Sequence, residues 1–242
     1  MCTVSYIPGH QKCFLTSNRD EKIRRGLALP PCFYKHEQRV LLYPKDADAG
    51  GTWIAMQENE TAAVLLNGGF VKHSSTPPYK KSRGLVMLDV LADSDPLQTL
   101  LQYPLAGVEP FTLVLLQKGK LFEIRWDGKQ LWHTALDEGK PHIWSSVTLY
   151  DTAMIHKREH WFSDWLKENP SPDQKAILHF HQFTGEGNSH IDLCMNRDNS
   201  LLTVSITSME ITSAGGRMQY HDLRSDRIYT TDMKYFSEQV IS

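Results

Sequence analysis

The sequence predicts an α+β fold of antiparallel sheets with helices on their outer faces. Strand-like segments fill the N-terminal half, a meander and two helices occupy the middle, and strand-like alternation returns near the C-terminus. This order is typical of antiparallel sheets rather than of repeated βαβ units. The chain has 242 residues, of which 40% are hydrophobic, so we expect a single domain spanning residues 1–242.

Turn and capping signals define the elements of the first half. A hairpin is expected where Pro8-Gly9-His10 separates two strands, and a second where Glu58-Asn59-Glu60 does so. Ser82 is a candidate N-cap for the first helix. The expected strands are 2–7, 13–18, 52–57 and 61–66, and the expected helices are 84–91 and 96–102.

The second half begins with a meander whose turns fall at Lys118-Gly119 and Asp127-Gly128. A long helix and a shorter one follow, and the shorter helix begins at Ser171-Pro172, with Ser171 and Gln174 placed as a capping box. The expected strands are 111–116, 121–126, 131–136, 191–195, 201–206, 209–212 and 219–223, and the long helix is 152–168.

Composition excludes several classes of protein. The formal net charge of -2 gives no reason to expect a nucleic-acid partner. No apolar run approaches the roughly 20 residues of a membrane-spanning helix, and we expect no signal peptide, since Met1-Cys2-Thr3-Val4-Ser5 has no basic segment followed by an apolar stretch. The cysteines (Cys2, Cys13, Cys32 and Cys194) form no CxxC pair, so we expect free thiols and a cytoplasmic location. The sequence does not indicate an oligomeric state.

Cys2 is the first candidate for chemistry. Removal of Met1 would leave a thiol and a free α-amine on one residue. The amine, with a pKa near ~8, can act as a base near neutral pH, and a thiol of pKa ~8.5 is already partly ionised. Nucleophile and base would then come from one residue. The alternative is an inert residue at the start of a strand.

The first hairpin brings further candidates toward Cys2. If its turn centres near Gly9-His10, Cys2 pairs with Asn18 to within about a residue, beside Arg19 and Asp20. An arginine there would favour the thiolate or hold a substrate carboxylate, and an aspartate could orient the α-ammonium group. The register leaves open which of the three faces the thiol.

These residues resemble a known family. Ser17-Asn18-Arg19-Asp20-Glu21 is similar to the Asn-Arg-Asp-Glu signature of the NRDE family, which includes the transport and Golgi organisation proteins. Further anchors run in family order over most of the chain: Met1-Cys2, Gly50-Gly51-Thr52-Trp53, Leu66-Asn67-Gly68, Ser82-Arg83-Gly84 and Thr203-Val204-Ser205.

The resemblance implies an N-terminal-nucleophile hydrolase fold, a four-layer αββα sandwich, and a distant relation to bile-salt and penicillin V acylases. In that group an N-terminal cysteine attacks an amide carbonyl. By resemblance, Cys2 is the nucleophile, Arg19 and Asp20 flank it, and Asn67 donates to the oxyanion. We expect substrate contacts from Asn18, Trp53, Ser145 and Ser146.

The chain departs from the pattern at two places. Ser145-Ser146 stands where the acylases carry an asparagine, and Arg25-Gly26 stands where family members often have Arg-Pro. A serine side chain is shorter than that of asparagine, so the equivalent contact need not form.

A competing signal is His156-Lys157-Arg158-Glu159-His160, which reads as the H-x-x-E-H string of some zinc peptidases. On a helix, however, both histidines lie opposite the apolar face and toward water, so we expect a solvated surface and no metal. His179 and His181, two residues apart on a helix, are expected to be surface or packing residues.

Two functions therefore remain. The first is an amidohydrolase that cleaves a small acyl-amide at Cys2 without a cofactor. The second is a non-catalytic carrier of haem or another hydrophobic ligand in the same fold, since a thiolate can also ligate haem iron.

Overall fold

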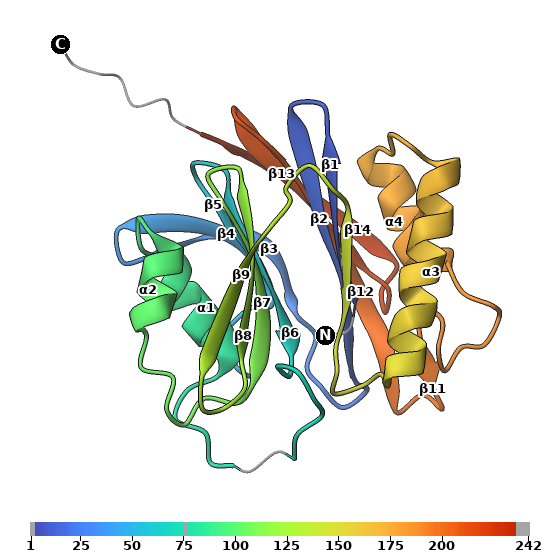
Figure 1. Cartoon of the computed structure of the whole chain (residues 1–242), viewed down its shortest axis with the longest axis horizontal. Coiled ribbons are helices and arrows are strands. Elements are labelled where there is room, and N and C mark those ends of the chain that lie inside the picture. Colours follow the sequence, from blue (N-terminus) through green and yellow to red (C-terminus); the bar gives the residue numbers. More distant parts are fainter. Residues whose placement is uncertain (1–2, 75–76, 236–242) are drawn as a thin grey trace.

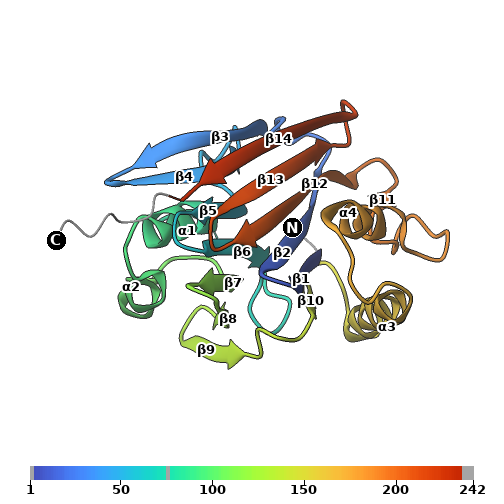
Figure 2. The same ribbon diagram turned by 90° about the horizontal axis from the view of Figure 1, so that it is seen from above.

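A computed structural model describes residues 3–74 and 77–235. These residues form four layers, with two β-sheets face to face and helices outside each (Figure 1). Helices α1 (Arg83–Leu91) and α2 (Pro96–Gln102) cover one sheet, and α3 (Thr152–Glu168) and α4 (Gln174–Phe183) cover the other (Figure 2). The four-layer αββα sandwich expected from the sequence is confirmed.

Both sheets are antiparallel throughout the described residues. The β1 sheet has the order β10-β1-β2-β12-β13-β14, with β11 also on β12, and the β6 sheet runs in chain order from β3 to β9. The strands of the β1 sheet are β1 (Thr3–Gly9), β2 (Lys12–Lys22), β10 (His142–Ser145), β11 (Asn196–Arg197), β12 (Leu201–Thr212), β13 (Gly215–Asp222) and β14 (Arg227–Lys234). Those of the β6 sheet are β3 (Leu29–His36), β4 (Arg39–Lys45), β5 (Ile54–Gln57), β6 (Thr61–Asn67), β7 (Phe111–Gln117), β8 (Lys120–Trp126) and β9 (Leu131–Leu136).

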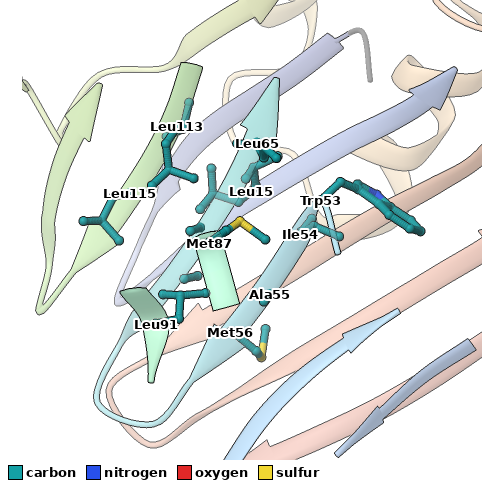
Figure 3. Packing of buried hydrophobic residues seen from close by; sticks show 14 of the residues in the cluster. Leu15, Trp53, Ile54, Ala55, Met56, Leu65, Met87, Leu91, Leu113 and Leu115 are labelled. Carbon is teal, nitrogen blue, oxygen red and sulfur yellow. The ribbon is translucent and has the colours of Figure 1, made fainter. Parts of the chain in front are cut away.

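The main core lies between the sheets and continues through the β6 sheet to α1. Leu15 of β2 belongs to the same buried cluster as Leu65 of β6 and Met87 of α1 (Figure 3). A second cluster, which includes Phe14, Phe162 and Phe180, fills the space between the β1 sheet and its helices. Successive residues of β2 thus serve different cores, as the alternation of side chains along a strand requires.

Most sequence-predicted elements are present, and several local predictions were wrong. Residues 191–195 are irregular, because their polar groups bond within a loop; residues 201–212 form the single strand β12. The N-cap of α4 is Asp173, whose carboxylate accepts from Ala176 N, so the capping box at Ser171 is not formed. Strands β3, β4, β10, β11 and β14 were not predicted.

The pairing of β1 and β2 sets the position of the candidate site. Thr3 pairs with Asn18 on one side and with Ser145 on the other. A β-bulge in β12 follows at the same end, where the register to β2 shifts between Thr203 and Ser205. Bulges re-aim neighbouring side chains and are frequent beside active sites.

Candidate active site

A polar cavity of about 220 Å³ opens at the end of the β1 sheet and contains much of the predicted site. Arg19, Trp53 and Asn67 all line it, so the structure brings three sequence-predicted residues together. The remaining lining residues are Glu21, Arg25, Asp46, Ala49, Gly51, Thr52, Leu65, Ser82, Arg83 and Gly84. We call this space the arginine cavity.

The charges of the arginine cavity are organised around Asp46. Arg19, only 2% exposed, donates to Asp46 Oδ2 at 2.6 Å, and Arg25 donates to both carboxylate oxygens. Backbone N–H groups of Asp48 and Ala49 bond the same carboxylate. Burial opposes ionisation of Asp46, but the Ala49 N–H, the Arg25 hydrogen bonds and the two arginine charges together lower its pKa. The carboxylate therefore stays ionised and fixes both guanidinium groups.

Trp53 forms a wall of the arginine cavity. The Arg19 guanidinium lies 4.5 Å from the centre of a Trp53 ring, within the range of cation–π attraction. The indole Nε1 is buried and has no hydrogen-bond partner among the described residues. A buried donor without an acceptor is uncommon in folded proteins.

Asn67 ends β6 and is fixed through its backbone. Ser146 Oγ donates to the Asn67 carbonyl at 2.8 Å, which ties this strand end to the segment after β10. Gly68 follows with φ +86°, and a Cβ there would lie 2.6 Å from a methyl of Val147. Only glycine fits this turn without strain. No described residue hydrogen-bonds the Asn67 side-chain amide, which leaves its N–H groups available.

A second cavity, of about 240 Å³, shares Asn67 with the arginine cavity. Ser145 and Ser146 line it, together with Trp144 and Glu159. Ser145 therefore lies beside a cavity, as a substrate contact would, whereas the Ser146 hydroxyl is engaged with Asn67 and Thr148.

Asn18 and Asp20 lie on the opposite face of β2 and do not line the arginine cavity. The Asn18 amide donates to the carbonyls of His181 and Leu193, and its oxygen accepts from His181 Nδ1 at 2.6 Å. The Asp20 carboxylate accepts from Thr203 Oγ1 at 2.5 Å and from the Tyr150 hydroxyl at 3.1 Å. Strand alternation thus separates the three consecutive residues that the hairpin places near Cys2.

Cys2 itself lies outside the described residues. Of the other cysteines, Cys13 is buried, and burial raises the pKa of its thiol to about 12. Burial likewise raises the pKa of Cys194 to about 11, while Cys32 is exposed on β3. Neither Cys13 nor Cys194 therefore has the ionised thiol that a nucleophile requires.

The histidines of the H-x-x-E-H string face solvent, as predicted. His156 and His160 are both exposed on α3, and His160 pairs with Asp164 one turn away at 3.0 Å. Between them, Arg158 is fully buried on the other side of the helix. His179 is exposed and His181 is fully buried, in line with surface and packing roles.

Asp46, Arg83 and Arg158 were missed by the sequence analysis. Asp46 sits in a loop without a motif, and only its contacts show its role. Arg83 lies within a motif but was not assigned a role; its guanidinium pairs with Glu109 at 3.0 Å. Arg158 could have been found, because it is spaced four residues from both Met154 and Phe162 and so shares their helix face.

Comparison with solved structures defines the class of the fold. The chain is similar to an N-acylethanolamine-hydrolyzing acid amidase orthologue from Caenorhabditis elegans, with 13% identity, a TM-score of 0.59, and 86% of this chain and 92% of that chain covered. It is also similar to two variants of the conjugated bile acid hydrolase from Clostridium perfringens, both at 12% identity. Their TM-scores are 0.57 and 0.58, with coverage of 96% and 100% of this chain and 92% and 100% of the others. The fold is that of the N-terminal-nucleophile hydrolases.

The family follows from the sequence comparison. The model of the family described as "Transport and Golgi organisation 2" matches residues 1–214, and the chain belongs to this family. No curated protein sequence matches the chain. Within residues 3–74 and 77–235, none of the helices combines the length and apolarity needed to traverse a bilayer.

Proposed function

We propose that this protein is an amidohydrolase in which Cys2, exposed by removal of Met1, cleaves the C–N bond of a small acyl-amide. The observation that carries the proposal is the convergence of Arg19, Trp53 and Asn67 on one cavity at the end of β1. The fold shared with an acid amidase and a bile acid hydrolase agrees with this chemistry.

Covalent geometry relates Cys2 to this cavity. Cys2 is bonded to Thr3, and consecutive Cα atoms are about 3.8 Å apart. Thr3 pairs with Asn18, whose chain neighbour Arg19 lines the arginine cavity, and with Ser145, which lines the second cavity. The start of β1 is therefore adjacent to both spaces that meet at Asn67.

The proposed reaction has two steps. The Cys2 sulfur attacks the carbonyl carbon while the α-amine takes the thiol proton, and the Asn67 amide donates to the developing oxyanion. The C–N bond then breaks as the amine returns the proton to the leaving nitrogen, which gives a thioester and a free amine. Water, deprotonated by the α-amine, attacks the thioester, releases the carboxylic acid and restores the thiol.

The surrounding residues support this assignment. The positive charge of Arg19, held by Asp46, favours a thiolate nearby. We expect Asp20, on the other face of β2, to accept from the α-ammonium group of Cys2 when that group is protonated. The α-amine supplies the base and the thiol the nucleophile, so the proposed chemistry uses no metal or organic cofactor.

Turnover of a panel of acyl-amides tests the proposal. The panel contains N-acyl amino acids, N-acyl homoserine lactones, penicillin V and conjugated bile salts. On the best substrate, Cys2→Ala should abolish turnover, and Cys2→Ser should leave little. The matched control is Cys32→Ala, which removes an exposed thiol on β3 and should retain full activity.

Asn67→Ala should lower kcat by about 10²–10³ while KM changes little, because the lost hydrogen bond forms mainly in the transition state. Turnover that survives Cys2→Ala would contradict the nucleophile assignment. No turnover across the panel, with micromolar haem binding unaffected by Asn67→Ala, would favour the carrier function instead.

The proposal also implies a reducing compartment such as the cytoplasm, because an oxidised Cys2 could not attack a carbonyl. The described cysteines, Cys13, Cys32 and Cys194, are all free thiols, which agrees with such a compartment.

A further inference from the structure

Arg158 is a fully buried arginine that the proposed reaction does not use. Its side chain extends from α3 toward the β1 sheet and has an exposed fraction of 0%. One guanidinium nitrogen donates to Thr3 Oγ1, and the other donates to the carbonyls of Ile191 and Asp192 at 3.0 and 2.9 Å. Arg158 thus contacts the first described residue of β1.

The positive charge of Arg158 is not neutralised by an ion pair within the described residues. Neutral acceptors surround it instead, and the Tyr150 ring lies 3.6 Å from the guanidinium carbon. Arg158 Nε has no hydrogen-bond partner among those residues. A buried charge without a counter-ion is costly to keep, and a hydrophobic residue of similar volume would often be more stable here. This cost points to a role other than stability.

Tyr150 connects Arg158 to the candidate site. Its ring stacks on the guanidinium, while its hydroxyl donates to Asp20 at 3.1 Å. Arg158 therefore contacts the start of β1 directly and reaches Asp20 through one aromatic side chain. Its field also extends to His181, whose pKa falls to about 3 because of burial and, second, because of the Arg158 charge.

We propose that Arg158 is a positioning residue for the amide hydrolysis proposed above: it fixes the start of β1 through Thr3, holds Tyr150 against Asp20, and favours the ionised thiol of Cys2 through its buried charge. The inference rests on the proposed function, because it assigns Cys2 as the nucleophile. It adds a residue on α3 to a site otherwise built from the sheets.

Other charges face this region and set the background for any pH dependence. Asp20 lies on β2, and Arg19 lies on the opposite face of the same strand. Arg197 of β11 lies 5.4 Å from the Tyr150 ring, and Glu159 of α3 lines the cavity beside Ser145. His181 of α4 is neutral near pH 7 because its pKa is about 3. Arg158 is the buried cation that contacts Thr3 itself.

The test measures alkylation of Cys2 by iodoacetamide as a function of pH, a readout that needs no substrate. Arg158→Met keeps most of the side-chain length but removes the charge. We expect it to raise the apparent pKa of Cys2 alkylation by about 1 and to slow alkylation near pH 7 about tenfold. Arg158→Lys keeps the charge and should restore most of the pH profile. Lys157→Met, on the exposed side of the same helix, is the matched control and should behave as wild type.

Thr3→Val separates positioning from charge. It removes the hydroxyl that Arg158 bonds but leaves the guanidinium in place. We expect it to lower kcat on the best substrate several-fold while the pH profile of alkylation stays close to that of wild type. If Arg158→Met does not fold, Thr3→Val and Arg158→Lys still test the two roles.

The inference would be overturned if folded Arg158→Met had the same pH profile of alkylation as wild type. It would also be overturned if Arg158→Lys shifted that profile while Thr3→Val left kcat unchanged. In both cases wild type would still turn over the substrate through Cys2. Failure of the proposed function appears differently, as absence of turnover in wild type. A shifted profile in Arg158→Met would then still support the electrostatic role.

Discussion

The two faces of the β1 sheet contact buried arginines in opposite settings, Arg19 from β2 on one face and Arg158 from α3 on the other. On the face toward the β6 sheet, Arg19 is held by the Asp46 carboxylate at 2.6 Å and lines an open cavity. On the face toward the helices, Arg158 reaches Thr3 without a carboxylate partner in the described part of the chain. We propose that the first face contacts the ligand and that the second orients β1, the strand that follows the proposed nucleophile.

The ion pairs on the first face depend on Asp46. Of the substitutions considered, Asp46→Asn should lower the free energy of unfolding the most. Asp46→Asn removes the closer of the two carboxylates that pair with buried Arg19 and leaves only Glu21 at 3.7 Å, and loss of one partner of a buried pair costs about 3 kcal/mol. Urea unfolding at pH 7 measures the loss. Asp48→Asn, at an exposed carboxylate 3.5 Å from Arg25, is the control and should cost under about 0.5 kcal/mol. Equal effects of the two variants would contradict the assignment of Asp46 as the centre of this face.

The lowered pKa of Asp46 also implies that its contribution to stability is lost at low pH. Its folded-state pKa lies below the ordinary value of 3.8, so its contribution is fully present above about pH 4. The contribution should be lost as the pH falls through the folded-state pKa. The difference in unfolding free energy between wild type and Asp46→Asn should therefore shrink in urea titrations below pH 4, and a difference that grew there would be inconsistent with an ionised Asp46.

On the helix-facing side, His181 should make stability depend on pH over a different range. Burial lowers the pKa of His181 from 6.5 to about 3, so below pH 6.5 the unfolded chain binds a proton that the folded chain does not. This group should cost wild type about 1.4 kcal/mol of stability per pH unit as the pH falls from ~6.5 toward 3. In His181→Gln that component of the slope should vanish, whereas His179→Gln, at an exposed position on the same helix, should retain it. Unfolding free energies at pH 7, 6 and 5 measure both slopes.

On the helix-facing side, the connection between Arg158 and Asp20 can be weakened at Tyr150. Tyr150→Phe keeps the ring against Arg158 but removes the hydroxyl that bonds Asp20, a hydrogen bond to a charged group worth about 1.5–3 kcal/mol. We expect Tyr150→Phe to lower the free energy of unfolding by about 1.5 kcal/mol and to reduce turnover of the best acyl-amide substrate. A loss of stability without any change in turnover would show that Asp20 does not need this orientation.

The smallest effect is expected on the solvent side of α3. The double substitution His156→Ala and His160→Ala should change stability by less than about 0.5 kcal/mol, because both side chains are exposed. Elemental analysis of protein purified without added metal accompanies it. Near-stoichiometric zinc that disappears in the double variant would overturn the solvated-surface interpretation of this helix.

The sequence predicted the strands and helices of the layers better than it predicted the contacts of the candidate site. Turn residues and alternation were sufficient for hairpins such as β1–β2, because these signals are local. Strands β3 and β4 were missed although they form a local hairpin, since Pro30-Pro31 and a mixed polar and apolar pattern hide the alternation typical of strands. Asp46 and Arg158 were missed for a different reason, because their roles come from contacts with Arg19 and Thr3, which are distant in the sequence.

Local reasoning also placed Asn18, Arg19 and Asp20 together beside the start of β1, and in sequence they are consecutive. Strand alternation then divides them, with Arg19 toward the arginine cavity and the other two toward the helices. Alternation along β2 predicts that Arg19 lies opposite the other two residues, but the hairpin register alone could not reveal which face of β2 meets the second sheet.

The most direct test of the account is the site of alkylation under limiting iodoacetamide, followed by peptide mapping. If Cys2 is an activated N-terminal nucleophile, the N-terminal peptide should begin at Cys2 and be labelled before the peptides that contain Cys13, Cys32 or Cys194. Retention of Met1 in the native protein, or earlier labelling of any of the other three cysteines, would contradict the account.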